Sequence, residues 1–312
     1  MLGLLSRRPA AALASALARR CFTVAIDGPA ASGKSSTARA VARELGFGYI
    51  DSGSIYRCAT LLALRKRLDG PIASHSQELV NLISHAMIEI SIQASSQRSV
   101  QSVTGAGRLV VPDLQIMLDG EDVSREIRTP DVNRLVAKVA SDSGVRTAVL
   151  AIQRSLAAIA ESQPAITENE GKQVSIPGGV VMDGRDIGTT VFPNAELKIY
   201  LDASAMARAI RRWDELSSQF KEAEASRKKG EAGGKDGAEP AEEPAGYPSV
   251  EDIARELEQR DYADINREHS PLRIAPSAVV IDNTNMTFEQ QVYTITDLAR
   301  ERMGLPRKYD DL

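Results

Sequence analysis

Residues 22–36 have the sequence FTVAIDGPAASGKSS, and the rest of the fold can be predicted outward from this stretch. A mostly apolar run of strand length leads into the GxxxxGKS pattern of a P-loop at residues 28–35. Residues 37–45, which are rich in Ala, Arg and Glu, then predict a helix. The N–H groups of such a loop and the N-terminus of its helix converge on one point that favours phosphate oxygens. The stretch therefore predicts a binding site for a nucleoside triphosphate.

The expected roles of the loop residues follow from the charge of a triphosphate. Lys34 can reach the β- and γ-phosphates, and the hydroxyl of Ser35 can bind Mg²⁺. The residues predicted to surround the triphosphate are Gly28, Pro29, Ala30, Ala31, Ser32, Gly33, Lys34, Ser35 and Ser36. The alternative is a glycine turn that carries an unrelated lysine, and the strand before the loop and the helix after it argue against that interpretation.

Composition restricts the classes of protein to be considered. A chain of 312 residues can bury one large core or two modest ones. A net charge of −4 and an aromatic content of 4 % do not fit a nucleic-acid binder, which is usually strongly basic. No apolar run approaches the length of a membrane span. Cys21 and Cys58 leave little scope for a disulfide framework, which indicates a reducing compartment.

The first residues differ in character from the rest of the chain. Residues 1–20 contain four arginines and many Ala and Leu, and no acidic residue precedes Asp27. An Arg-rich, acid-free leader is typical of an organelle transit peptide. We therefore expect residues 1–21 to be a leader that directs the protein to the mitochondrial matrix, with a cytoplasmic protein that has a disordered N-terminal extension as the alternative.

Strand-like and helical segments alternate through the rest of the chain, which predicts an α/β fold with a largely parallel sheet. Further core strands are expected at residues 47–51, 178–183, 197–202 and 278–282. Further helices are expected at residues 58–68, 77–86, 131–160 with a break at 143–144, after residue 202, from residue 250 onward and at 287–303.

Two segments interrupt this alternation. Residues 87–92 alternate apolar and polar side chains, and residues 115–123 resemble a strand followed by a turn, so we expect a small antiparallel unit there. Residues 217–248 are dominated by Lys, Glu, Gly, Ala and Pro, and residues 230–246 have almost nothing to bury. A low-complexity, disordered insertion is expected over 217–248.

Candidate substrate-binding residues follow the predicted strands, where the ligands of α/β sheets collect. Asp183 ends an apolar strand, which is the position of a Walker B carboxylate that holds Mg²⁺ directly or through water. The residues expected near a second substrate, after the strand at 47–51, are Ser52, Gly53, Tyr56 and Arg57. Cationic groups that share helical faces are Arg146 with Arg154, then Arg208, Arg211 and Arg212, and finally Arg260 and Arg267 with Asp264 between them.

This set of residues fits phosphoryl transfer between two nucleotides. Such a transfer requires a P-loop for the donor, Mg²⁺, cationic groups around the migrating phosphoryl group, and an acceptor site with its own arginines. The sequence offers all four, because arginines are spread over several of the predicted segments. A simple hydrolase would not need so many.

The chain resembles the cytidylate kinases of the bacterial type. Beyond the P-loop, the motifs that carry the resemblance lie at residues 51–57, 120–124, 126–129, 183–189, 191–193, 198–204 and 260–267. They cover roughly residues 23–299 except the low-complexity insertion. The resemblance implies a three-layer P-loop NTPase fold with a central parallel sheet, a small antiparallel insertion that binds the nucleoside monophosphate, and a helical lid. It also implies a monomer that converts ATP and CMP or dCMP into ADP and CDP or dCDP with Mg²⁺, in pyrimidine nucleotide metabolism.

The resemblance assigns roles residue by residue. Arg185 and Asp186 match the cytosine-reading pair of the family, and a carboxylate suits the 4-amino group of cytosine but not the O4 of uracil. The residues that match the CMP site are Ser52, Gly53, Tyr56 and Arg57 at the monophosphate, Arg146, Arg260 and Arg267 at the phosphate and ribose, and Asp264 at the sugar hydroxyls. Arg212 is expected near ATP, the metal ligands are Ser35 and Asp183, and the expected catalytic groups are Lys34, Arg185, Arg208 and Arg211.

The resemblance also divides the chain into parts. Residues 22–303 are expected to form the kinase domain, with the monophosphate-binding unit at about 81–130, the lid at about 205–265, and a C-terminal tail at 304–312. One departure concerns the base: the family usually has a serine that contacts cytosine where this chain has Ala137, so UMP is expected to be a less poor substrate here.

Two other functions remain as alternatives. The first is another P-loop small-molecule kinase, such as an adenylate or shikimate kinase, and the Arg185–Asp186 pair and the antiparallel insertion argue against it. The second is a nucleotide-binding switch or scaffold that transfers no phosphate. The presence of Lys34, Ser35 and Asp183 together with the acceptor-site arginines argues against that alternative.

Overall fold

The computed structural model describes residues 21–68, 70, 72–99, 110–169, 172–230 and 248–309. The described residues form a five-stranded parallel sheet in the order β10-β9-β1-β8-β2. Its strands are β1 (Phe22–Asp27), β2 (Gly48–Asp51), β8 (Gly179–Gly184), β9 (Leu197–Asp202) and β10 (Val279–Asp282). All five strands were predicted within one residue of their observed bounds. The expectation of an α/β fold around a central parallel sheet is confirmed.

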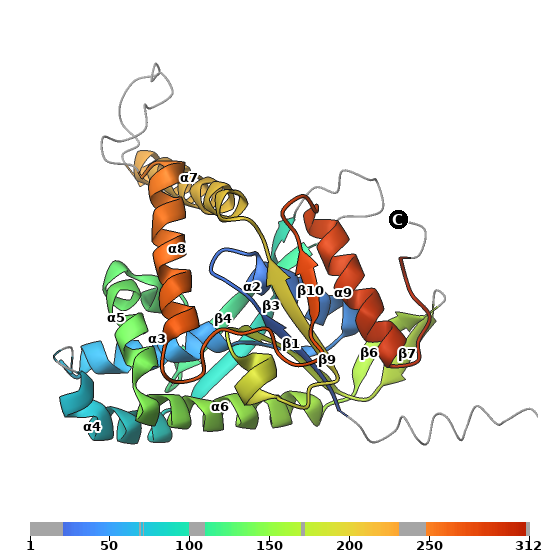
Figure 1. Ribbon diagram of the computed structural model, residues 1–312, viewed down its shortest axis with the longest axis horizontal. Helices are drawn as coiled ribbons and strands as arrows, with labels where there is room; N and C mark the ends of the chain where they lie inside the picture. Colours follow the sequence, from blue (N-terminus) through green and yellow to red (C-terminus); the bar gives the residue numbers. More distant parts are fainter. Residues whose placement is uncertain are drawn as a thin grey trace, which may run out of the picture.

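Helices cover both faces of this sheet and give it three layers (Figure 1). The α-helices among the described residues are α2 (Lys34–Leu45), α3 (Ser52–Arg65), α4 (Ile72–His85), α5 (Pro130–Ser141), α6 (Ser143–Glu161), α7 (Ala205–Gly230), α8 (Val250–Asn266) and α9 (Phe288–Arg302). Alternate residues of β1 point to opposite faces. Val24 and Ile26 pack into the cluster of α2 and α9, whereas Ala25 packs into the cluster of α3 and α6. Among the described residues, no helix is long and apolar enough to cross a membrane.

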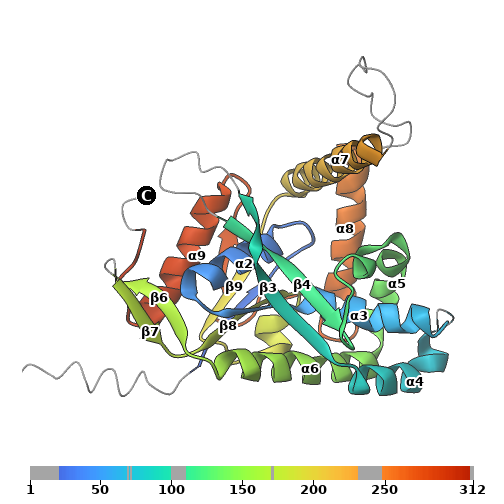
Figure 2. The same ribbon diagram turned by 180° about the vertical axis from the view of Figure 1, so that it is seen from behind.

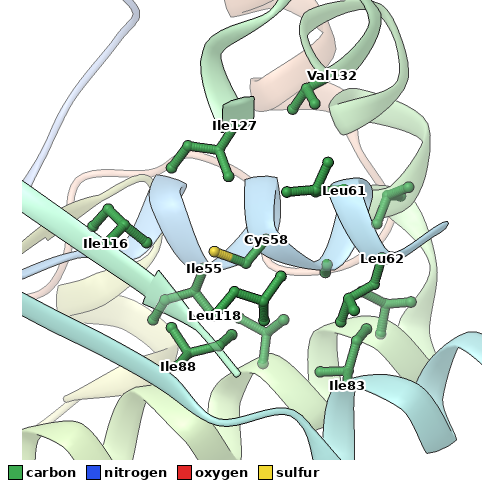
Figure 3. Packing of buried hydrophobic residues seen from close by; sticks show 14 of the residues in the cluster. Ile55, Cys58, Leu61, Leu62, Ile83, Ile88, Ile116, Leu118, Ile127 and Val132 are labelled. Atoms are coloured by element: carbon green, nitrogen blue, oxygen red, sulfur yellow. The ribbon is translucent and has the colours of Figure 1, made fainter. Parts of the chain in front are cut away.

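A second sheet among the described residues is antiparallel and consists of β3 (Ile88–Ser99), β4 (Val110–Leu118) and β5 (Glu121–Asp122), which confirms the expected antiparallel unit. Figure 2 shows β3 and β4 crossing in front of the central sheet. Figure 3 shows how the unit is attached: Ile55 and Cys58 of α3 pack against Ile88, Ile116 and Leu118. Because these side chains are almost completely buried, α3 and the antiparallel unit share one core.

Helix α3 begins six residues before the predicted start at Cys58. The carboxylate of Asp51 caps it by accepting a hydrogen bond from the backbone N–H of Ser54 at 3.0 Å. The stretch after β2 is therefore the first turn of a helix rather than a loop. A second difference is the hairpin of β6 (Ala165–Asn169) and β7 (Lys172–Ile176), which the sequence analysis did not predict.

Part of the segment expected to be disordered is helical. Helix α7 continues through residue 230, so the expectation of disorder over 217–230 is wrong. Ala, Glu and Lys are strong helix formers, and a helix that buries little can still extend from a packed N-terminal half. Residues 231–247, the remainder of the expected insertion apart from residue 248, lie outside the described residues. The chain resumes at Ser249, which forms a capping box with Asp252 at the start of α8.

Candidate active site

The predicted phosphate-binding loop connects β1 to α2. It lies at the end of the strands that is nearest to α7 and α8 (Figure 1). Gly28 has a φ of +151°, and a Cβ at this position would lie 2.1 Å from the carbonyl oxygen of Leu201. Only glycine can therefore pass so close to the end of β9. Gly33, at the N-terminus of α2, has a φ of +85°. The two glycines of the motif thus shape the loop, as the pattern predicts.

Lys34 is folded back over this loop. Its Nζ donates hydrogen bonds to the carbonyl oxygen of Pro29 and to Ser32 Oγ, and its side chain is buried. Burial lowers the pKa of Lys34 well below its usual range, and the nearby charges of Arg185 and then Arg260 lower it further. The charges of Asp183 and Asp27 act on this pKa in the opposite direction, so two cations and two carboxylates surround the ammonium group electrostatically.

Two helices and the end of β10 hold the loop from outside. Asp261 of α8 accepts a hydrogen bond from the N–H of Ala30 at 3.1 Å and pairs with Arg208 of α7 at 2.6 Å. Arg208 also donates to the carbonyl oxygen of Ala30 at 2.9 Å. Asn283, after β10, donates to the carbonyl oxygen of Ser32 at 2.8 Å and accepts a hydrogen bond from Arg211 at 2.8 Å.

Asp183 lies beside the loop because β8 is the neighbour of β1 in the sheet. Its carboxylate accepts hydrogen bonds from Ser35 Oγ at 2.6 Å and from the hydroxyl of Tyr49 at 2.7 Å. Asp51 pairs with Asp183 in the strand register, and burial followed by the charge of Asp183 raises the pKa of Asp51 to about 6. The structure thus brings together the two predicted metal ligands, Ser35 and Asp183, and adds Tyr49 as a partner.

These oxygen donors fit Mg²⁺. Magnesium prefers hard oxygen ligands and is usually held by one or two carboxylates together with substrate phosphates and water. Among the residues that the structure describes, no group of three or more His, Cys, Asp or Glu could form a closed metal site. A hydroxyl and a carboxylate next to a phosphate-binding loop match the partial coordination that magnesium takes in phosphoryl-transfer enzymes.

Asp27 connects the loop to the segment that follows β8. Its two carboxylate oxygens accept hydrogen bonds from the backbone N–H groups of Ile187 at 2.8 Å and Gly188 at 2.7 Å, at the start of the π-helical turn η2 (Ile187–Val191). Burial raises the pKa of Asp27 to about 6 in spite of these bonds. The bonds fix the backbone directly after Arg185 and Asp186.

The predicted acceptor residues form one chain of ion pairs. Arg185 Nε donates to Asp264 at 2.8 Å. Asp186 is 4 % exposed and pairs with Arg146, which reaches it from α6. Arg267 lies 3.9 Å from Asp186 and 3.8 Å from Asp264, so it joins the two carboxylates. Side chains from α6, α8 and the end of β8 therefore meet at one place.

The N-terminal part of α3 adds further predicted acceptor residues. Ser52 Oγ accepts a hydrogen bond from Gln153 of α6 at 2.7 Å. The guanidinium group of Arg146 lies 5.6 Å from the ring centre of Tyr56. Burial raises the pKa of Tyr56 to about 12. Arg57 instead donates to the carbonyl oxygen of Ile127 at 3.0 Å and to Asn133 at 2.6 Å, in the segment after the antiparallel unit.

A cavity of about 230 Å³ lies among these groups. Its walls come from α3, α6, the end of β8, η2 and the segment after α8. The residues that line it are Tyr56, Ser143, Arg146, Thr147, Leu150, Gln153, Asp186, Thr190, Val191, His269 and Ser270. Of the predicted site residues, Tyr56, Arg146 and Asp186 therefore share one cavity.

Two of the predicted arginines make other contacts. Arg212 pairs with Glu215 of its own helix at 2.7 Å, on an exposed surface. Arg154 donates to the carbonyl oxygens of Thr190 and Val191 at 3.2 Å, and so supports η2 from α6. Sequence reasoning also missed four side chains that hold the site together: Tyr49, Gln153, Asp261 and Asn283. Each bonds to a group at least 100 residues away, and no local pattern indicates such a partner.

The predicted mitochondrial location is wrong. The similar proteins described in the next paragraph, whose matches cover nearly the whole chain, come from bacteria, which have no mitochondria. Residues 1–20, on which the prediction depended, lie outside the described residues.

Comparison with known proteins agrees with this geometry. The family model described as cytidylate kinase matches residues 24–229 and 240–301. A cytidylate kinase of Pelodictyon phaeoclathratiforme is 39 % identical over 91 % of this chain and 97 % of its own length. Cytidylate kinases of Chlorobaculum tepidum and of a Geobacillus strain are 37 % and 35 % identical, each over 92 % of this chain and over 96 % and 100 % of their own lengths. The chain belongs to the cytidylate kinase family.

Proposed function

We infer that this protein transfers the γ-phosphoryl group of ATP to CMP or dCMP, giving ADP and CDP or dCDP. Membership of the cytidylate kinase family supports the donor and the class of acceptor. The single observation that carries the proposal is at the end of β8. There Asp183 faces Ser35 of the donor loop, and Asp186, three residues later, faces Arg146 and Arg267. One short segment therefore serves both halves of a two-nucleotide site.

On the donor side, the loop N–H groups and Lys34 would hold the triphosphate. Arg185 and Arg260 act electrostatically on Lys34, and we propose that these three cations stabilise the charge of the migrating phosphoryl group. Arg208 and Arg211 were expected to be catalytic. Their contacts with Ala30 and Asn283 favour a role in positioning the loop, and we propose this role for both.

Ser35 and Asp183 would hold Mg²⁺. When bound, the ion neutralises charge on the phosphate oxygens. The hydrogen bond between Ser35 Oγ and Asp183 brings the two oxygen donors close together, and Tyr49 keeps the carboxylate oriented through its other oxygen. These contacts support the assignment, since ligand orientation by outer hydrogen bonds is typical of metal sites.

On the acceptor side, Asp186 would accept a hydrogen bond from the 4-amino group of cytosine. Uracil carries an oxygen at the same position, and two acceptors facing each other in a buried site are unfavourable. The partners of Asp186, Arg146 and Arg267, hold its carboxylate in place and would offer donors to the nucleotide. The groups proposed for the phosphate are Ser52, Gly53, Arg57 and Arg260, and Asp264 is proposed for the sugar.

We also propose the limits of the domain, the helices of the lid and the oligomeric state. The kinase domain spans residues 22–303, α7 and α8 belong to the lid, and the chain acts as a monomer. The contacts of α7 and α8 with Ala30 support a lid that reaches the donor loop.

The purified full chain, supplied with ATP and Mg²⁺, tests the function. ADP formation should be fastest with CMP or dCMP, slower with UMP and slowest with AMP. If AMP is the best acceptor, or if there is no turnover, the proposal is refuted. Asp186→Ala should lose the preference for cytosine and keep its affinity for ATP. An equal loss of both properties would contradict the role given to Asp186.

A further inference from the structure

His269 lies in the segment after α8 and lines the cavity beside Asp186, together with Ser270. Neither residue has a role in the function proposed above. We propose that His269 contacts the nucleoside part of the acceptor nucleotide and contributes to its affinity. This inference depends on the proposed function, because it takes the cavity to be part of the acceptor site.

The turn that carries His269 is fixed by the acceptor residues themselves. Arg267 Nε donates to the carbonyl oxygen of Ser270 at 2.7 Å, and the N–H of Leu272 donates to the carbonyl oxygen of Asp264 at 2.8 Å. Ser270 has a φ of +49°, a left-handed conformation that is uncommon for a residue other than glycine. Hydrogen bonds to Arg267 and Asp264 of the proposed acceptor site therefore hold the backbone of this turn in place. They fix the position from which the His269 side chain extends.

The walls of the cavity suit a flat, polar heterocycle. The ring of Tyr56 and the side chains of Leu150 and Val191 supply apolar surface, whereas Gln153 and Asp186 supply hydrogen-bonding groups. Binding sites for small molecules typically combine mostly apolar walls with a few placed polar groups. A nucleobase with part of its sugar has this chemical character.

A donor that lacks a partner adds an independent indication of a ligand. Arg267 Nη2 is buried and has no hydrogen-bond partner among the described residues, although it lies 3.9 Å from Asp186. Buried donors are nearly always satisfied, so such a group calls for a missing acceptor. A carbonyl or hydroxyl oxygen of a nucleoside would supply that acceptor next to Asp186, which lines the cavity together with His269.

An imidazole can contribute to such a site in two ways. A neutral ring offers one donor and one acceptor, and its face can stack on a base. A single net hydrogen bond changes a dissociation constant by about three- to tenfold. His269 is exposed, so an effect of that size on nucleotide affinity is expected without a loss of folding.

The kinetic test is His269→Ala in the full chain. We expect the KM for CMP to rise about three- to tenfold, whereas kcat and the KM for ATP should stay within a factor of two. His269→Asn, which keeps a donor and an acceptor, should recover part of the affinity. The matched control is His85→Ala, because His85 lies on α4, outside the residues that line the cavity, and its ring hydrogen-bonds to the carbonyl oxygen of Asn81 on its own helix at 2.7 Å. A KM for CMP in His269→Ala equal to that of His85→Ala would overturn the proposal.

A second measurement reports contact rather than activity. The chain has three histidines, His75, His85 and His269, so diethyl pyrocarbonate labelling followed by mass spectrometry can resolve all of them. CMP should slow the labelling of His269 and leave that of His85 unchanged. A raised KM without protection of His269 would mean an indirect effect and would refute the contact.

The proposed function and this inference fail in different ways. If the wild-type protein phosphorylates CMP but His269→Ala is unchanged, only the inference is wrong. If the wild-type protein neither binds nor phosphorylates CMP, the proposed function is wrong and the inference is refuted with it.

Discussion

Replacing Asp261 by Asn tests whether helices α7 and α8 hold the phosphate-binding loop in place. Asp261 accepts a hydrogen bond from Ala30 at 3.1 Å and pairs with Arg208 at 2.6 Å, and the Arg208 side chain is 7 % exposed. An amide can still accept the bond from Ala30, but it leaves the buried guanidinium group without a negative partner. Breaking one side of a buried ion pair typically costs 3–5 kcal/mol. Because Arg208 keeps its bonds to the carbonyl oxygens of Ala203 and Ala30, we expect a loss of about 3 kcal/mol, the lower end of that range.

Two measurements follow this perturbation. Urea unfolding should show the loss of about 3 kcal/mol in the free energy of unfolding. Steady-state kinetics should show a KM for ATP raised about tenfold, because Arg208 loses the carboxylate that holds it against the carbonyl oxygen of Ala30 in the donor loop, and a 1.4 kcal/mol weakening is tenfold in affinity. Glu258→Gln, an exposed change of the same kind on the same helix, is the matched control and should alter neither quantity.

A double variant separates stability from binding. Arg208→Met combined with Asp261→Leu removes both charges, so most of the lost stability should return, as it does when buried ion pairs are replaced by apolar groups. The KM for ATP should remain high, because the N–H of Ala30 then has no acceptor from α8. If Asp261→Asn unfolds within 1 kcal/mol of the wild type and binds ATP normally, the loop is not held in this way and the reasoning fails.

Three further predictions concern pH, the C-terminal segment and the base. Burial raises the folded-state pKa of Asp27 to about 6, so its contribution to stability should be complete below about pH 4 and fall by about 3 kcal/mol as the pH rises through 6; Asp27→Asn should make urea unfolding between pH 4 and 8 less pH-dependent by that amount, while Asp51, whose pKa is also raised to about 6, keeps its own contribution. Tyr309 stacks on Tyr293 at 3.8 Å and donates to Glu44 of α2, so Tyr309→Ala should lower the thermal midpoint by several degrees and Tyr309→Phe by less. Ala137→Ser should raise the ratio of kcat/KM for CMP over UMP by about tenfold, and an unchanged ratio would count against the role given to this position.

The parts of the fold that the sequence predicted are those with a local signal. The P-loop, the five core strands and the antiparallel unit each have a pattern that lies within a few residues. The hairpin at residues 165–176 is short and only partly buried, so its signal was weak. The extension of α7 to residue 230 has no clear local signal, because a lack of apolar residues is typical of disorder, whereas a composition rich in Ala, Glu and Lys also favours a helix.

The site was predicted only in part for a different reason. A motif indicates which residue type is needed, and so Lys34, Asp183, Arg185 and Asp186 could be named in advance. The identity of the partner of each group depends on which helices the fold brings together. The sequence does not distinguish Asp261, for example, from the other charged residues of an amphipathic helix. Its bond to Ala30 depends on the packing of α8 against the donor loop.

The two proposed nucleotide sites share charged groups as well as the end of β8. Lys34 and Arg260 each have a lowered pKa, caused first by burial and next by the charge of Arg185. Arg185 in turn is bound to Asp264, which also lies beside Arg267 in the proposed acceptor site. Cations held this close repel one another, and bound phosphate groups would remove that repulsion. A phosphate group bound in one site would reduce the repulsion among these cations, and the same cations would bind the phosphate group in the other site. Each nucleotide should therefore strengthen the binding of the other.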